Sequence, residues 1–297
     1  MPIIDHQGVL KGVTVQEAMR RQVVRLPQEA FLAAAIRATI KFKVNALLIT
    51  DERLTGLGVV SKTDLMGAYY AGLPLETPLG HVMVGPPVFC SPRDSLDAAL
   101  DRMREHQIHR LYVVGEAPQQ PIGVLAYPDI VGLLYRFCKN CERNVMRKKG
   151  GDSAYLPADH YRMREVMTPS VYAHSAGDSL HRVMEGLAAN RFGAVPILDE
   201  YQRPVGVVSK TDLMAAYLHG VPIHTEARAI MTFPVQACDQ EEFLVVALQQ
   251  MIFSDIHRLF ISKGGLSNLV GVFSLSDAAR IRSGTCRACV TSRIKIG

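Results

Sequence analysis

GVVSKTDLM occupies residues 58–66, and the same nine residues return at 206–214. A nine-residue identity inside one chain of 297 residues is far beyond coincidence, so it marks either a shared binding element or a duplication. Shifting the chain against itself by 148 residues also aligns IHRL at 108–111 with IHRL at 256–259, and it pairs all six cysteines. The chain is therefore two copies of one large unit.

Each half divides once more. The glycine, valine and aspartate of the repeated segment recur 65 residues later in both halves, as Gly123, Val124 and Asp129 and as Gly271, Val272 and Asp277. Four repeats follow from this spacing. The polar segment between the halves carries basic residues and a glycine pair, which is typical of a linker.

Within a repeat the hydrophobic period changes in a fixed order. Residues 27–42 carry apolar side chains at helical spacing, 46–51 and 56–61 have the pattern of short buried strands, and 62–72 begin a second helix. A short strand also precedes each unit, as at 87–91. This order predicts an α/β (α+β) fold of helix, strand, strand, helix with an extra short strand. One unit is too small to cover both faces of its sheet, so we expect neighbouring repeats to pair face to face.

The composition is that of an ordinary folded protein, with 48% hydrophobic and 21% charged residues. The net charge of +5 is a mild basic excess, which suits anionic ligands at local sites. No apolar run reaches the roughly eighteen residues of a membrane span, and the first ten residues lack a signal-peptide pattern. We therefore expect a cytoplasmic protein.

Two interpretations of the repeated segment concern the start of a helix. Ser61 with Asp64, and Ser209 with Asp212, fit a capping box, in which the serine and the acid bond each other's backbone amides. Capping explains neither the lysine and threonine between them nor the full identity of the two copies. A phosphate loop is disfavoured, because Ser61 replaces its required glycine and Pro204 begins the second copy.

A third interpretation uses the strand end, the helix start and the acid together. A helix N-terminus presents free amides to an anion, and a fixed carboxylate can accept both hydroxyls of a ribose. Ser61, Lys62 and Thr63 would then hold the phosphate end of the ligand. This arrangement predicts a ribonucleotide.

Four units that end a strand with G-x-x-S-x-[ST]-D or a variant of it resemble the CBS domains, named after cystathionine beta-synthase. The resemblance covers nearly the whole chain. It implies four CBS repeats paired into two Bateman modules, an arrangement similar to the gamma subunit of AMP-activated kinase. The expected boundaries are module 1 at 1–137 (repeats at about 10–74 and 75–137), a linker at 138–158, module 2 at 159–285 (repeats at about 159–222 and 223–285) and a tail at 286–297.

The resemblance also implies where an adenine nucleotide would bind. In the family the motif aspartate grips the ribose hydroxyls, and hydroxyl, histidine and arginine side chains contact phosphates. Carried over position by position, the ribose acceptors are Asp64, Asp129, Asp212 and Asp277. Their expected partners are Ser61, Lys62, Thr63, Ser209, Lys210, Thr211, Ser274, Ser276, His109, Arg110, His257 and Arg258. The second repeat departs from the motif, since Ala126 and Pro128 supply no hydroxyl.

Four of the six cysteines form two CxxC pairs that follow the last expected helix of each half: Cys138 with Cys141, and Cys286 with Cys289. Four thiolates are the number that tetrahedral zinc or an iron–sulfur cluster requires. Three interpretations stay open: a shared metal, a dithiol redox switch, and inert cysteines kept through duplication. Cys90 and Cys238 lie in short expected strands and are interpreted as buried small hydrophobic side chains.

The repeats and the linker take up almost the whole chain, which favours a binding module over an enzyme. No HExxH, no G-x-S-x-G and no intact phosphate loop is present, so we assign no catalytic residue. The first hypothesis is a sensor that binds AMP, ADP or ATP as a regulatory ligand and signals to another protein, alone or as a homodimer. The alternative is a metal or redox sensor with partly vestigial nucleotide sites. Nucleic-acid binding is disfavoured, because no aromatic residues interleave with the basic residues of 143–149.

Overall fold

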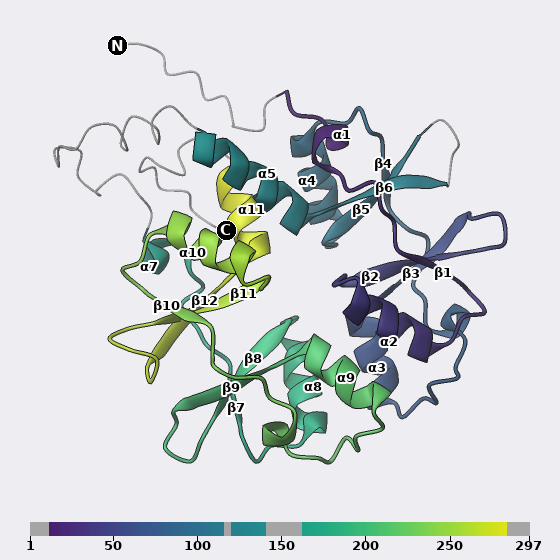
Figure 1. The fold of residues 1–297 in the computed structure, drawn as a ribbon. Coiled ribbons are helices and arrows are strands. Elements are labelled where there is room, and N and C mark those ends of the chain that lie inside the picture. Colours follow the sequence, from purple (N-terminus) through teal and green to yellow (C-terminus); the bar gives the residue numbers. More distant parts are fainter. Residues whose placement is uncertain (1–11, 116–119, 141–161, 284–297) are drawn as a thin grey trace, which may run out of the picture.

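A three-stranded sheet and two main helices make up each repeat, in the order strand, helix, strand, strand, helix (Figure 1). The computed structural model describes residues 12–115, 120–140 and 162–283. The elements of repeat 1 are β1 (Arg25–Pro27), α2 (Leu32–Lys41), β2 (Ala46–Thr50), β3 (Gly56–Ser61) and α3 (Lys62–Tyr70). Those of repeat 2 are β4 (Phe89–Cys90), α4 (Leu96–Glu105), β5 (Arg110–Val114), β6 (Pro121–Ala126) and α5 (Tyr127–Asn140).

The second half repeats this plan. Repeat 3 consists of β7 (His174–Ser175), α8 (Leu180–Ala189), β8 (Ala194–Leu198), β9 (Pro204–Ser209) and α9 (Lys210–Leu218). Repeat 4 consists of β10 (Ala237–Asp239), α10 (Leu244–Phe253), β11 (Arg258–Ser262), β12 (Leu269–Ser274) and α11 (Leu275–Ser283). Short helical turns lie ahead of the repeats' first strands: α1 (Val15–Ala18), η1 (Leu79–His81), α7 (Met163–Val166) and η3 (Ala227–Ala229).

In every sheet the middle strand pairs in parallel with the first strand and antiparallel with the last, as β2 does with β1 and β3. The α/β fold of four repeats expected from the sequence is thereby confirmed. The helix expected over 27–42 begins only at Leu32, because Pro27 ends β1 opposite Thr50 and the next residues form a turn. The hydrophobic spacing alone does not reveal this turn.

The middle strand is buried on both faces, which explains its continuous apolar sequence. In β2, Leu47 and Ile49 pack with the helices, whereas Leu48 packs on the other face against Tyr112 and Val124 of repeat 2. Alternate residues of a strand point to opposite faces, so one strand serves two cores. Repeats 3 and 4 pack their sheets in the same way, through Val207 of β9 in repeat 3 and Phe260 and Val272 of repeat 4. Each half is thus a pair of repeats joined sheet to sheet, here called module 1 and module 2.

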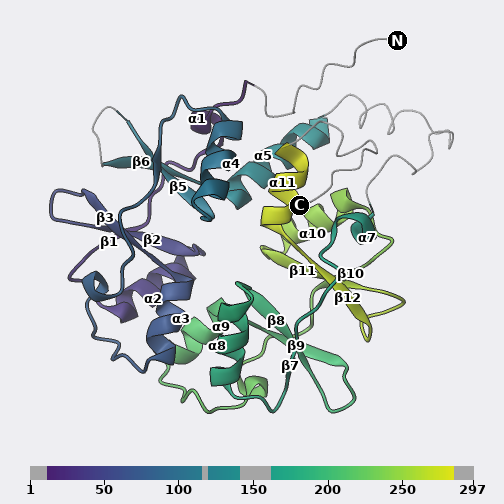
Figure 2. The same ribbon diagram turned by 180° about the vertical axis from the view of Figure 1, so that it is seen from behind.

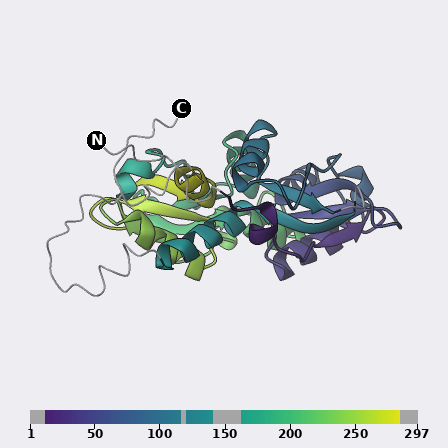
Figure 3. The ribbon, with the colours of Figure 1, turned by 90° about the horizontal axis from the view of Figure 1, so that it is seen from above.

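The helices join the two modules. α3 contacts α9, and α5 contacts α11, so repeat 1 packs on repeat 3 and repeat 2 on repeat 4. Two large cores result, each built from both modules. The four repeats form a ring in the order 1, 2, 4, 3 (Figures 1 and 2), and seen from the edge the ring is a flat disc (Figure 3). No helix within the described ranges is both long enough and apolar enough to span a membrane.

A tyrosine pair marks the pseudo-twofold axis between the modules. The rings of Tyr69 and Tyr217 stack with their centroids 4.7 Å apart. The Tyr69 hydroxyl donates to the backbone oxygen of Val221, and the Tyr217 hydroxyl donates to that of Leu73, both at 2.5 Å. Each contact is the twin of the other under the shift of 148 residues, so the interface is self-complementary.

The glycine that opens each repeated motif lets another backbone segment come close. A Cβ on Gly123 would lie 2.7 Å from the Met19 sulfur and 2.9 Å from the backbone oxygen of Arg20. Gly58, Gly206 and Gly271 meet Met83, Met231 and Met167 in the same way. The segment ahead of each repeat therefore crosses onto the sheet of the partner repeat, over a strand position that has no room for a side chain.

We expect Gly123→Ala to lower the free energy of unfolding by about 1–3 kcal/mol, because the added methyl group collides with backbone as well as with a side chain. Gly67→Ala is the matched control, since Gly67 lies in α3 with nothing within 4 Å and its counterpart in α9 is Ala215. This control should raise the stability by about 0.5–1 kcal/mol. Urea unfolding measures both variants, and equal effects would contradict the close approach.

Candidate functional site

The repeated motif forms the start of a helix in both modules. The Ser61 hydroxyl accepts hydrogen bonds from the amides of Thr63 and Asp64, and Asp64 Oδ2 accepts one from the Ser61 amide at 2.7 Å. Ser209 and Asp212 do the same for α9. The capping interpretation is confirmed, but it uses only one oxygen of each aspartate.

The lysine and threonine of the motif meet their own copies across the module boundary. Lys62 Nζ donates to Thr211 Oγ1 at 2.8 Å, and Lys210 Nζ donates to Thr63 Oγ1 at 2.7 Å. These reciprocal bonds explain why two residues that capping does not require are identical in both copies. The two motifs thus lie side by side at the contact of repeats 1 and 3.

Both lysines sit in positive, partly dehydrated surroundings. Burial, with the charge of Arg110 added, lowers the pKa of Lys62 to about 8. Burial and the charge of Arg258 lower the pKa of Lys210 to about 8 as well. Burial and the charge of Lys62 also lower the pKa of His257. Basic side chains from all four repeats therefore act on one another near the centre of the disc, a setting that suits an anion.

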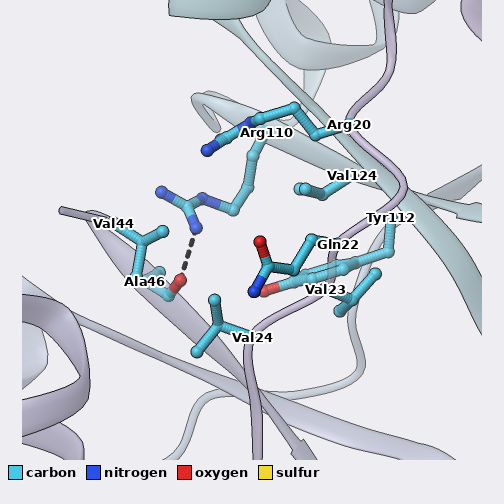
Figure 4. Close-up of a pocket in the computed structure, with 9 residues that line it drawn as sticks. All are labelled: Arg20, Gln22, Val23, Val24, Val44, Ala46, Arg110, Tyr112 and Val124. Atoms are coloured by element: carbon cyan, nitrogen blue, oxygen red, sulfur yellow. Dashed lines mark hydrogen bonds between the residues drawn. The ribbon is translucent and has the colours of Figure 1, made fainter. Parts of the chain in front are cut away.

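The arginines of the two IHRL segments bridge the repeats within each module. Arg110 of repeat 2 donates to the backbone oxygen of Ala46 in repeat 1 at 2.5 Å (Figure 4). Arg258 of repeat 4 donates to that of Ala194 in repeat 3 at 3.0 Å, with its guanidinium 4.8 Å from the Phe192 ring centre. Burial lowers the pKa of both arginines.

The histidines of the same segments directly precede the middle strands β5 and β11. Asn45 and His257 are joined by a side-chain hydrogen bond of 2.9 Å between Nδ2 and Nδ1, which links repeat 1 to repeat 4 across the module boundary. His109 lies 5.6 Å from the Tyr127 ring. The expected phosphate contacts of these histidines and arginines stay predictions, and in this structure the side chains bond within the protein.

One position that the sequence analysis did not single out supplies the partner of the second aspartate oxygen in two of the four repeats. It is the residue that follows the methionine of each leading segment and bridges to the motif strand of the partner repeat: Arg20, Val84, Thr168 and Thr232. Each pairs with a strand residue five places before a motif aspartate. The recurring methionines at 19, 83, 167 and 231 were the signal from which this position could have been found.

The four motif aspartates therefore differ in whether their second carboxylate oxygen, Oδ1, already has a partner within the protein. Asp129 Oδ1 forms an ion pair with Arg20 Nε at 2.7 Å, and Asp212 Oδ1 accepts a hydrogen bond from the Thr232 hydroxyl at 2.9 Å. Asp64 and Asp277 use Oδ2 for the cap, and no described residue bonds their Oδ1. Those two oxygens remain available to a ligand hydroxyl.

In repeat 4 the hydroxyls of the motif bond each other. Ser274 Oγ lies 2.7 Å from Ser276 Oγ and donates to Asp277 Oδ2 at 2.5 Å. Repeat 2 has no such hydroxyls, and from the described residues Asp129 Oδ2 accepts only the Ala126 amide, at 2.9 Å. Because repeat 2 departs from the motif, its aspartate lacks the serine hydroxyl that bonds the aspartate of repeat 4.

The cysteine predictions fall largely outside the described residues. Cys141, Cys286 and Cys289 lie beyond the described ranges, and only the backbone of Cys138 is described, near the end of α5. Among the described residues no cluster of His, Cys, Asp and Glu could hold a metal ion. Cys90 is buried and Cys238 half-buried, and burial raises the pKa of both thiols to about 12.

Comparison with known proteins identifies the repeat. The family model of the CBS domain matches residues 15–71, 79–136, 163–219 and 227–284. Protein MJ1225 of Methanocaldococcus jannaschii is 22% identical over 203 residues, which are 67% of this chain and 68% of that protein. Its crystal structure, described as that of a proposed archaeal homologue of g-AMPK, has a TM-score of 0.74 at 16% identity and covers 91% of this chain and 99% of its own. At this identity the likeness shows the fold alone.

Two further matches cover only part of this chain. The CBS domain protein PAE2072 from Pyrobaculum aerophilum, solved in complex with AMP, is 23% identical, with a TM-score of 0.38, and covers 46% of this chain and 97% of its own. A homoserine O-acetyltransferase of Methanosphaerula palustris is 26% identical over 127 residues, which are 43% of this chain and 25% of the enzyme. The chain therefore spans a quarter of that enzyme's length.

The lysines at the module boundary predict a pH dependence of stability. Their folded pKa of about 8 lies below the ordinary value of 10.5, so between these values the unfolded chain binds more protons and stability rises with pH. We expect the unfolding free energy of the wild type, minus that of Lys62→Met/Lys210→Met, to grow by about 1 kcal/mol per lysine from pH 8 to 9.5. If urea unfolding gives the same difference in unfolding free energy at both pH values, the two lysines do not have lowered pKa values in the folded protein.

Proposed function

The chain belongs to the CBS domain family, and from that premise we propose that it is a regulatory protein that binds adenine nucleotides between paired repeats. AMP, ADP and ATP share the groups that such a site would recognise: a ribose with two hydroxyls, an anionic phosphate end and a purine. The site residues carried over from the family remain proposals. The described residues support the aspartates through their hydrogen bonding and the basic residues through their charge.

The observation that carries the proposal is that the two carboxylate oxygens of a motif aspartate have different roles. In Asp64 and Asp277 one carboxylate oxygen is held rigidly by the helix cap, while no described residue bonds the other. A fixed carboxylate with a spare oxygen is the kind of group that accepts ribose hydroxyls. In Asp212 the spare oxygen takes a threonine hydroxyl, which a ribose hydroxyl could replace.

The basic side chains near the disc centre support binding of the phosphate end. Lys62, Lys210 and His257 come from three repeats, and their pKa values are lowered first by burial and second by neighbouring positive charge. A phosphate group would relieve this mutual repulsion and gain charge-assisted hydrogen bonds. The side-chain bonds that the lysines now make to threonines would have to compete with it.

The regulatory output would come from the module boundary. The same lysines and threonines join the two modules, so a nucleotide that draws a lysine toward its phosphate changes a contact between repeats 1 and 3. Such a ligand favours one arrangement of the modules only by its differential affinity for it. A partner protein, which is not identified, would then sense that arrangement.

We expect Asp64→Ala and Asp277→Ala each to weaken AMP binding about 10- to 100-fold at the altered site, because a charged acceptor of ligand hydroxyls is lost. Asp199→Ala is the control, since the Asp199 carboxylate holds the turn between β8 and β9 through the amides of Tyr201 and Arg203. Calorimetric titration with AMP measures all three. Unchanged affinity in the first two variants would reduce the motif to a helix cap.

A second candidate function is metal or redox sensing through the CxxC pairs. One observation favours it: α5, which carries Cys138, packs against α11, which ends three residues before Cys286. Helices of repeats 2 and 4 that lead into the two pairs are thus neighbours.

Metal analysis of protein purified without oxygen tests this candidate. Zinc or iron would be expected in the wild type and lost in Cys138→Ser/Cys286→Ser. Cys90→Ser is the matched control, because Cys90 is buried in β4. A metal-free wild type, or a metal content that the double substitution leaves unchanged, would contradict a cluster at these cysteines.

A further inference from the structure

The two modules are equivalent in backbone but not at the residue that faces the motif aspartate. Arg20 and Thr168 are counterparts under the shift of 148 residues, and each bridges to the last strand of its module, at Val124 and Val272. Arg20 makes an ion pair with Asp129, whereas no described residue bonds Asp277 Oδ1. Within the described residues, the aspartate of the Asp129 cleft is thus ion-paired with a leading-segment arginine, whereas the aspartate of its twin cleft at Asp277 is not.

With the ion pair, each carboxylate oxygen of Asp129 has a partner. Its Oδ2 accepts the Ala126 amide and its Oδ1 accepts Arg20 Nε, and only 9% of the side chain is exposed. Burial raises the pKa of Asp129, and the positive charges of Arg20 and Arg110 oppose this rise without cancelling it. A ribose hydroxyl would therefore have to displace a charged donor with a neutral one, which is unfavourable.

The space beside this ion pair is small. Arg20, Gln22, Tyr112 and Arg110 line a pocket between repeats 1 and 2 whose cavity volume is about 10 Å³, enough for one water molecule (Figure 4). Both arginines point into the region that these side chains share (Figure 4). A nucleoside cannot enter unless at least one of the two arginines moves.

We propose that Arg20 is a built-in occupant of the cleft at Asp129, which closes one of the four nucleotide sites and makes the adenylate capacity of module 1 lower than that of module 2. This inference rests on the proposed function. The twin position holds Thr168, which is not a cation, and Asp277 there has the hydroxyl of Ser274 on Oδ2, with Ser276 next to that hydroxyl. The residue after each leading methionine is therefore a specificity-determining position.

The test is the AMP stoichiometry of reciprocal variants. Arg20→Thr should gain one bound AMP per chain, because it gives Asp129 the neighbour that Asp277 has. Thr168→Arg should lose one, because it supplies Asp277 with an internal cation. Thr168 is exposed, so this second variant has room for the longer side chain and keeps the test valid even where Arg20→Thr is unstable.

Two further variants separate occupancy of the cleft from a merely structural role. Arg20→Lys retains a cation and should keep the wild-type stoichiometry. Arg20→Thr/Asp129→Ala should lose the gained site, since the gain depends on the released carboxylate. Equal stoichiometry in wild type and Arg20→Thr, or an undiminished one in Thr168→Arg, overturns the role of Arg20 while nucleotide binding stands. No AMP binding to any of these chains overturns both.

Discussion

The contact of α3 with α9 is the constraint on which the disc depends. These helices begin at the two copies of the motif, and each copy is the other's binding surface. A surface that packs on its own twin must satisfy every contact twice, as the lysine–threonine and tyrosine–carbonyl pairs do. Since the helical cores combine residues from both modules, neither module completes its own core.

Capping and ligand binding are not rival roles for the motif aspartate. One oxygen fixes the start of a helix, and this fixed geometry leaves the other oxygen in a defined place. The residue opposite the second oxygen belongs to a different repeat. It lies in the leading segment of that repeat, which crosses the motif strand at a glycine. The glycine therefore serves the site indirectly, because without the close approach no residue of the partner repeat would reach the acid.

The repeats, the strands and the helix caps could be predicted from the sequence because they depend on local patterns. The run at 46–49 is apolar throughout and buried throughout, and Ser61 with Asp64 is a signal contained in four residues. The ion pair of Arg20 with Asp129 and the bond from Lys62 to Thr211 join residues more than 100 positions apart, across repeat and module boundaries. No local pattern specifies such a partner, so repeat equivalence predicted the aspartates but not their neighbours.

The fusion of two equivalent halves into one chain has a genetic consequence. In a homodimer of half-length chains a single codon change would alter two symmetric positions at once, so both clefts would open or close together. In this chain the twin positions are encoded separately, and one holds Arg20 while the other holds Thr168. The two modules can thus keep their symmetric packing while the residues that line each cleft change independently.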